Sequence, residues 1–167
     1  MNLYGFAGGD PVNFSDPFGL CPTPDGKDDG KPCAISVTQW AGSGSNPFGH
    51  VSVSVNGNVY SEGPVSARDM LGGKGAYIRG SMTDQDFAKE AEPGRAHSTS
   101  KLTLTQAQAT EVAKSLTRFD GSYYNVLTHN CTDPIQDGLR AAGLTLSHTV
   151  KPQALMDNLA NQGLIKR

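Results

Sequence analysis

The segment HVSVSVNGNVYSE, from His50 to Glu62, constrains the fold of this chain more than any other. Apolar and polar residues alternate up to Val55, and the alternation resumes after the turn, which is the period of a half-buried β-strand. Asn56-Gly57, between the two runs, is the strongest short signal for a two-residue hairpin turn. The sequence therefore predicts an antiparallel β-hairpin at this place.

Other elements are expected on both sides of this hairpin. Residues 35–40 (ISVTQW) alternate and carry β-branched side chains, which indicates a strand, and a further short strand is expected at 76–79. Helical periodicity and capping residues, among them the capping box Thr105-x-x-Gln108, predict helices at 83–91, 105–116, 132–142 and 152–163. The expected fold class is α+β, with a small antiparallel sheet packed with three or four helices.

Composition narrows the class of protein. The chain has 167 residues, of which 37% are hydrophobic and 18% charged, and its 20 Gly and 10 Pro suit one loop-rich domain. The net charge is −2 and the longest basic cluster is the terminal Lys166-Arg167, so a nuclease is disfavoured on electrostatic grounds. No apolar run reaches the roughly 18–20 residues of a membrane span, and the N-terminus does not resemble a signal peptide.

The three cysteines, Cys21, Cys33 and Cys131, are an odd number, so at least one has no partner within the chain. Cys21 and Cys33 bracket a stretch rich in Pro, Gly and Asp, and residues 21–34 are expected to be a linker. A disulfide between these two would close a loop, and two unpaired thiols are the equal alternative. No second Cys/His pair has the spacing of a zinc site, so no metal is expected.

Cys131 is the candidate nucleophile, because THNCTDPIQDGL places it one or two residues before the expected start of a helix. A thiol there lies at the positive end of the helix dipole, where free N–H groups stabilise a thiolate or a developing oxyanion. His50 is the candidate base, since a Cys at a helix end and a His on an adjoining strand form the nucleophile–base pair of thiol hydrolases. The alternatives are a buried structural thiol and an exposed strand residue.

The group that orients the His50 imidazole depends on the register of the hairpin. With a two-residue turn, His50 lies opposite Gly63 and shares a face with Ser61. With a three-residue turn, Glu62 and Tyr60 move to the His50 face. Glu62 is preferred among the three, because a carboxylate stabilises an imidazolium.

The remaining polar candidates have weaker patterns. Asn130 is a candidate for stabilising the oxyanion, and its alternative role is a local cap. His129 is only two residues from Cys131, which makes contact between these two side chains awkward. His97 and His148 lie in polar stretches and are expected to be solvated.

The first twenty residues have a different character. NLYGFAGGDPVNFSDPFGL contains two Asp-Pro pairs and no basic residue, and from Asn2 to Leu20 it resembles the end of the shell of Rhs/YD-repeat proteins. In that family the shell ends in autoproteolysis after the DPxGL motif, which implies Asp16 as the cleavage aspartate and Leu20–Cys21 as the cut bond. The resemblance implies a shell tail at 1–20, the linker, and a toxin domain at 35–167.

Residues 35–142 resemble the circularly permuted branch of the papain-like NlpC superfamily, which includes the lecithin–retinol acyltransferase group. FGHVSVSVNGNVYSEG is similar to the His-bearing hairpin of that branch, and YYNVLTHNCTD is similar to its Asn-Cys helix start. The resemblance implies a permuted papain-like fold. It also implies acyl transfer in which Cys131 attacks a carbonyl, His50 moves the proton and a thioester forms, with no metal or organic cofactor.

Together the two resemblances imply a secreted antibacterial effector toxin, exported by a type VI apparatus and delivered to the membrane or periplasm of a target cell. Phospholipid acyl esters are the first expectation for the substrate, peptidoglycan amides the second, and a target protein, by proteolysis or deamidation, the third. The expected partners are the Rhs shell and a cognate immunity protein, and no nucleic acid. A binding module in which Cys131 and His50 are unrelated in space is the non-enzymatic alternative.

Overall fold

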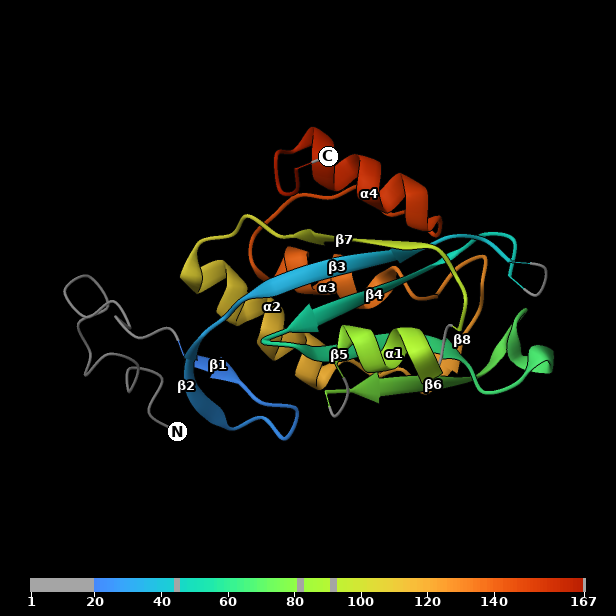
Figure 1. The fold of residues 1–167 in the computed structure, drawn as a ribbon, viewed down its shortest axis with the longest axis horizontal. Coiled ribbons are helices and arrows are strands. Elements are labelled where there is room, and N and C mark those ends of the chain that lie inside the picture. Colours follow the sequence, from blue (N-terminus) through green and yellow to red (C-terminus); the bar gives the residue numbers. More distant parts are fainter. Residues whose placement is uncertain (1–19, 44–45, 81–82, 91–92, 167) are drawn as a thin grey trace.

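A computed structural model describes residues 20–43, 46–80, 83–90 and 93–166. Its centre is a six-stranded antiparallel sheet in the order β7-β3-β4-β5-β6-β8 (Figure 1). The strands are β3 (Ile35–Trp40), β4 (His50–Val55), β5 (Asn58–Pro64), β6 (Gly73–Arg79), β7 (His97–Lys101) and β8 (Tyr123–Tyr124). The helices are α1 (Asp84–Glu90), α2 (Gln106–Arg118), α3 (Asp133–Ala141) and α4 (Pro152–Asn161), with a short 3-10 helix at Ala67–Asp69. The fold class is α+β, as predicted.

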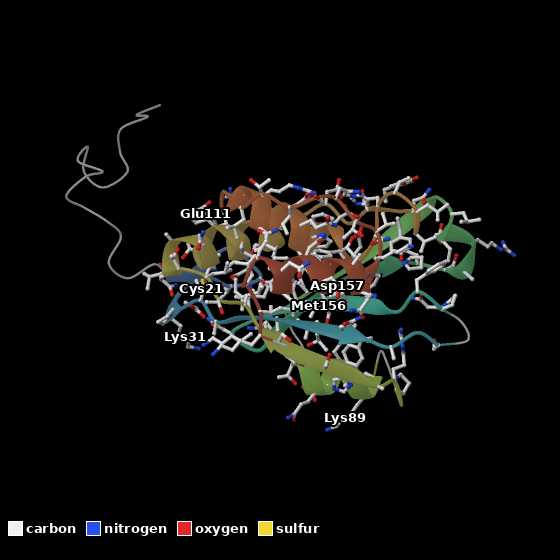
Figure 2. The ribbon with its side chains drawn as sticks, turned by 90° about the horizontal axis from the view of Figure 1, so that it is seen from above. Cys21, Lys31, Lys89, Glu111, Met156 and Asp157 are labelled. Carbon is white, nitrogen blue, oxygen red and sulfur yellow. A yellow bond between two sulfur atoms is a disulfide. The ribbon has the colours of Figure 1, made fainter. Side chains whose placement is uncertain are left out.

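The helices cover the two faces of the sheet unequally. Figures 1 and 2 show α1 on one face and α2, α3 and α4 on the other. The α2–α4 face holds the larger core, in which Val51 and Val53 of the sheet and Leu116 of α2 are all 1% exposed or less. Trp40 and Phe87 belong to a smaller core under α1. Since each fully buried large apolar side chain contributes about 1.5–3 kcal/mol, the larger core supplies most of the hydrophobic stabilisation.

The β4–β5 hairpin turns in two residues. Asn56 and Gly57 have φ angles of 49° and 82°, and Val55 pairs with Asn58 across the turn. Positive φ at both central residues is what a type I′ turn requires, and the twist of that turn matches the twist of the strands. The two-residue alternative for the register is therefore confirmed.

Most elements predicted from the sequence are present near their expected bounds. Helix α2 begins after Thr105, whose hydroxyl accepts a hydrogen bond from the Gln108 amide at 3.2 Å, as the capping box predicts. Helix α3 begins after Thr132, and α4 begins at Pro152. The sequence predicts neither β7 nor β8. Strand β7 reads HSTSK and is mostly exposed, so it lacks the alternation that marks a half-buried strand.

Residues 21–34 form a small structured unit, so the predicted linker is wrong. Strand β1 (Leu20–Pro22) pairs with β2 (Asp28–Pro32) in a separate two-stranded antiparallel sheet, and a disulfide joins Cys21 to Cys33. Cys21 is 1% exposed, belongs to the larger core and lies near α2 (Figure 2). Of the two alternatives for these cysteines, the disulfide is the one that forms. The disulfide and the burial of Cys21 fix a stretch whose polar composition suggests flexibility.

The predictions for the first twenty residues fall mostly outside the described residues. Asp16 lies outside them, whereas Leu20, on the amino side of the predicted cut bond, is the first residue of β1. Among the described helices, none is both long enough and apolar enough to cross a membrane.

Candidate active site

Cys131 lies where the chain turns into α3. Thr132 is the N-cap residue and Asp133 is the first residue of the helix, so the thiol lies two residues before α3, as predicted. Cys131 is 5% exposed and belongs to the larger core. The thiol is therefore near the positive end of the α3 dipole but shielded from water.

Asn130 holds the turn in front of α3 through both ends of its side-chain amide. Its Nδ2 donates to the carbonyl oxygens of Val126 at 2.8 Å and Val150 at 2.9 Å. Its Oδ1 accepts a hydrogen bond from the Thr132 amide at 3.0 Å. Because both amide hydrogens are used in this way, the structure supports the local cap for Asn130 and not the oxyanion role.

His50 is the first residue of β4, and 7% of it is exposed. Its Nε2 lies 2.7 Å from the hydroxyl oxygen of Ser61 on β5, and its ring stacks on Phe87 of α1 with 6.3 Å between centroids. The imidazole is therefore on the α1 face of the sheet. Ser61 orients the imidazole, and the preference for Glu62 is wrong. Successive residues of β5 point to opposite faces of the sheet, and the two-residue turn places Ser61, not Glu62, on the same face as His50.

Tyr60 also lies away from His50. It is 1% exposed in the larger core, and its ring centroid is 6.3 Å from that of Tyr77. Burial raises the pKa of the Tyr60 hydroxyl. Tyr60 is therefore a core residue on the α2–α4 face and does not orient the imidazole.

Glu62 contacts His129 instead of His50. The Glu62 side chain is 0% exposed, and its Oε1 lies 3.3 Å from Nε2 of His129, an ion-pair distance without hydrogen-bond geometry. Burial raises the pKa of Glu62 to about 8, and the carboxylates of Asp133, Asp137 and Asp120 add to this effect. The sequence pattern does not reveal this pair, because it joins a strand and a loop 67 positions apart.

A backbone hydrogen bond connects Cys131 with the strand that carries His50. The amide of Val51, the residue after His50, donates to the Cys131 sulfur. The β4–β5 ladder includes Val53 paired with Tyr60, and alternate residues of an antiparallel strand direct their N–H groups toward the same neighbour. The Val51 amide therefore faces the β5 side of β4, beyond the last pair of that ladder. The sulfur approaches the β4 backbone there, one residue from His50. The two side chains lie on opposite faces of the sheet, the thiol in the α2–α4 core and the imidazole on the α1 face, and no hydrogen bond joins them in the described part of the chain.

Burial keeps both members of the pair neutral. The pKa of the Cys131 thiol is raised to about 12, because burial outweighs the hydrogen bond from the Val51 amide. The pKa of His50 is lowered to about 4 by burial and then by the positive charge of Arg95. At neutral pH the closed site therefore holds a thiol and an uncharged imidazole.

The other two histidines lie outside this site. Nε2 of His148 is 3.1 Å from Oδ1 of Asp133, and its side chain is 48% exposed. His97 is exposed, as predicted, but its ring also packs on Trp40 with 4.4 Å between centroids. Among the described residues, neither forms a hydrogen bond, ion pair or ring contact with Cys131 or His50.

A cavity of about 450 Å³ lies beside the His50 end of β4. Its walls include Trp40, the partner of His50 in the β3–β4 ladder, and Gly49, which precedes His50. Phe48, which is 56% exposed, and Gln153 of α4 complete this part of the wall. Neither His50 nor Cys131 is among the residues that line this cavity.

Among the residues that the structure describes, no group of three or more His, Cys, Asp or Glu side chains is placed to hold a metal ion. Comparisons with protein-family models, with curated proteins and with solved structures each found no match to this chain.

Proposed function

We propose that this chain contains the toxin domain of an Rhs/YD-repeat protein, and that the domain is a cysteine-dependent acyl hydrolase or acyltransferase of permuted papain-like fold. One observation carries the enzymatic part. The Val51 amide donates to the Cys131 sulfur at the start of α3, while Nε2 of the adjacent His50 contacts Ser61 at 2.7 Å. The toxin part depends on the resemblance of the DPFGL segment to the end of an Rhs shell.

Ser61 determines which ring nitrogen of His50 acts as the base. An Nε2–H that donates to the Ser61 oxygen leaves the lone pair on Nδ1. In the first step the Cys131 sulfur bonds to the carbonyl carbon of an ester, its proton passes to Nδ1, and the carbonyl oxygen becomes an oxyanion. The oxyanion then collapses, the leaving alcohol takes the proton from His50, and an acyl thioester stays on Cys131.

A second half-reaction regenerates the thiol. Water, or the hydroxyl of an acceptor, gives a proton to Nδ1 of His50 and attacks the thioester carbon. The sulfur leaves and takes that proton back, and the product is a free acid or a new ester. The positive end of α3 faces the oxyanion in both halves of the cycle.

The two side chains are neutral and lie on opposite faces of the sheet, so the proposed reaction begins only when substrate opens the site and brings them together. A thiol with a pKa of about 12 does not give its proton to an imidazole with a pKa of about 4. Burial raises the pKa of Cys131 and lowers the pKa of His50. An ester that brings polar groups and water to His50 therefore reduces the difference between the two pKa values. The closed structure is thus a resting state of the proposed enzyme.

Phospholipid acyl esters are the proposed substrate, because the His-then-Cys order matches the permuted branch. Peptidoglycan amides are the second candidate, and the cavity beside His50 favours them in one respect. Gln39 and Gln153 line that cavity and are joined by a hydrogen bond of 2.8 Å. Side-chain amides of this kind pair well with the peptide groups of a muropeptide.

Mass spectrometry of lipids and muropeptides from cells that express the full chain tests the proposal. Wild type is expected to produce lysophospholipid and free fatty acid, and Cys131→Ala and His50→Gln are expected to produce neither. His148→Gln is the matched control, since its Nε2 also has a partner, Asp133, outside the site. Altered muropeptides would move the substrate to peptidoglycan. Undiminished toxicity of Cys131→Ala would overturn the enzyme in favour of a binding module.

A further inference from the structure

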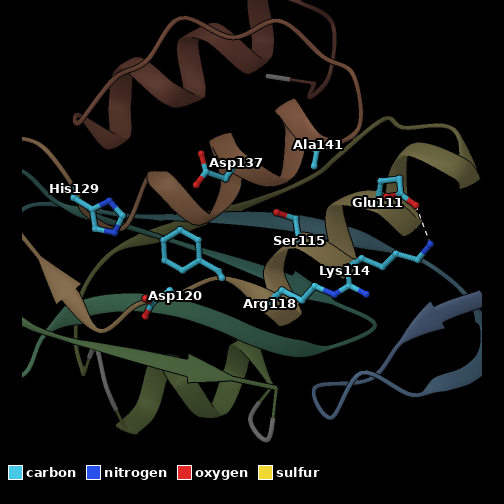
Figure 3. Close-up of a pocket in the computed structure, with 9 residues that line it drawn as sticks. Glu111, Lys114, Ser115, Arg118, Asp120, His129, Asp137 and Ala141 are labelled. Atoms are coloured by element: carbon cyan, nitrogen blue, oxygen red, sulfur yellow. Dashed lines mark hydrogen bonds and ion pairs between the residues drawn. The ribbon is translucent and has the colours of Figure 1, made fainter. Parts of the chain in front are cut away.

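A second pocket, of about 490 Å³, lies between α2 and α3 (Figure 3). Lys114 and Arg118 of α2, Asp137 of α3, and Asp120 and His129 of the intervening segment line it. The volume is in the range of pockets that hold small ligands. The proposed acyl transfer by Cys131 and His50 makes no use of this pocket.

Basic and acidic side chains gather at different ends of the pocket, apart from Glu111, which lies beside Lys114. Lys114 and Arg118 are one helical turn apart and lie at one end, while Asp120 lies at the end that holds His129 (Figure 3). Asp120 and His129 both line this end of the pocket. One end of the pocket is therefore positive and the other negative.

Neighbouring ion pairs leave this polarity in place. Glu111 binds Lys114 at 2.9 Å and Arg140 binds Asp137 at 3.1 Å, and all four side chains are more than a third exposed. Exposed pairs of this kind are weak and well screened by water. Within the described part of the chain, Arg118 has no ion-pair partner and is available to an anion.

A buried carboxyl group lies behind the negative end of the pocket. Glu62 lies behind His129, with 3.3 Å between Oε1 and Nε2, and is 0% exposed. Neither of its oxygens has a hydrogen-bond partner among the described residues, which is costly for a carboxylate. Burial and then the carboxylates of Asp133, Asp137 and Asp120 raise the pKa of Glu62 to about 8, so Glu62 is largely protonated at neutral pH and the negative charge at this end comes from Asp120 and Asp137. A cation bound beside His129 would offset these charges.

We infer that this pocket binds a small zwitterion, with its ammonium group beside Asp120, Asp137 and His129 and its anionic group against Arg118 and Lys114. Such a ligand carries an ammonium and an anion a few bonds apart. The phosphoethanolamine headgroup of a lipid and a short peptide with free ends both have this chemistry. Binding here is independent of the proposed chemistry at Cys131.

An NMR titration of the full chain tests this inference, with Cys131→Ala present throughout so that no acyl transfer occurs. The probes are O-phosphoethanolamine and dialanine, followed through the ring signals of His129. Inorganic phosphate and ethylammonium are the single-charge controls. We expect a saturable shift with at least one zwitterion, at an affinity at least tenfold higher than for either single-charge ion.

Arg118→Gln is expected to weaken zwitterion binding at least tenfold. Arg68→Gln, in the exposed 3-10 helix, is the matched control and is expected to bind as well as the parent. Binding of phosphoethanolamine alone would identify a lipid headgroup, and binding of dialanine alone would identify a peptide. The inference is overturned if neither zwitterion shifts His129 saturably, if phosphate alone binds as tightly, or if folded Arg118→Gln keeps full affinity. None of these results depends on whether Cys131 is a nucleophile.

Discussion

Cys131 is buried by the same contacts that bring its sulfur to the β4 backbone, one residue from His50. The sulfur accepts a hydrogen bond from the Val51 amide, and Asn130 fixes the turn that carries it to β4. In the proposed enzyme this burial would exclude water from a thioester, and it also keeps the thiol and the imidazole neutral in this structure. At the scale of single residues, burial therefore governs both reactivity and stability.

Cys131 is expected to react slowly with iodoacetamide in the folded protein. Raising its pKa from an ordinary value of 9.0 to about 12 lowers the thiolate fraction near neutral pH by about a thousandfold. Cys21 and Cys33 are joined in a disulfide, so Cys131 is the free thiol, and peptide mass spectrometry follows its alkylation. Equal rates at pH 8 in buffer and in denaturant would contradict the buried, neutral thiol.

Ser61→Ala is expected to lower the rate of acyl transfer by about tenfold or more, because the imidazole loses the partner that fixes its tautomer. The pH dependence of the rate should shift in the variant, which a loss of packing alone would not cause. Ser54→Ala removes another buried hydroxyl of the sheet, on β4, and serves as the control. Equal rates and pH profiles in Ser61→Ala and wild type would remove Ser61 from the site.

Glu62→Gln is expected to stabilise the fold at alkaline pH. The pKa of Glu62 in the fold, about 8, is above its ordinary value of 4.5, so its stabilising contribution is full below about pH 4.5 and is lost as the pH rises through 8. Wild type should lose on the order of 1–4 kcal/mol relative to Glu62→Gln between pH 5 and pH 9. Urea unfolding at a series of pH values measures this difference. Glu111→Gln, an exposed control, should follow wild type, and a parallel curve for Glu62→Gln would show that Glu62 is not buried as described.

At the scale of elements, the sequence predicts those structures that depend on interactions between residues close together in the chain. The alternation after His50, the Asn56-Gly57 turn and the Thr105 cap each act within a few residues, and all three are found in the structure. Strand β7 is polar and pairs with β3, a strand about sixty positions earlier, so its own sequence carries no signal of burial. The partner of His50 followed from the turn length, whereas the contact between Glu62 and His129 depended on how the loop before α3 packs on the sheet.

The disulfide between Cys21 and Cys33 is a feature at the scale of elements that the polar composition of residues 21–34 does not predict. Joining residues 12 positions apart stabilises a fold by about 3 kcal/mol, chiefly through the entropy of the unfolded chain. The variant with Cys21→Ser and Cys33→Ser together is expected to have a free energy of unfolding lower by this amount, and so to unfold at a lower urea concentration. Dithiothreitol should destabilise wild type but not this variant. Equal midpoints for the variant and wild type would show that the β1–β2 unit contributes nothing to the stability of the domain.

At the scale of the whole molecule, the Cys21–Cys33 disulfide fits the proposal that the domain is delivered to an oxidising compartment such as the periplasm. The cell that makes the proposed toxin also needs protection from it. We propose that an immunity protein gives this protection by covering the cavity beside His50. These proposals share one premise, which is that the Cys131 sulfur and the His50 imidazole work as one acyl-transfer unit.

Mass measurement of the intact protein after brief mixing with target-cell phospholipids tests that premise most directly. We predict an added acyl mass on wild type, located on the peptide that contains Cys131, absent from Cys131→Ala and strongly reduced in His50→Gln. No adduct on Cys131 with lipid or with muropeptides, together with full toxicity of Cys131→Ala, would contradict it.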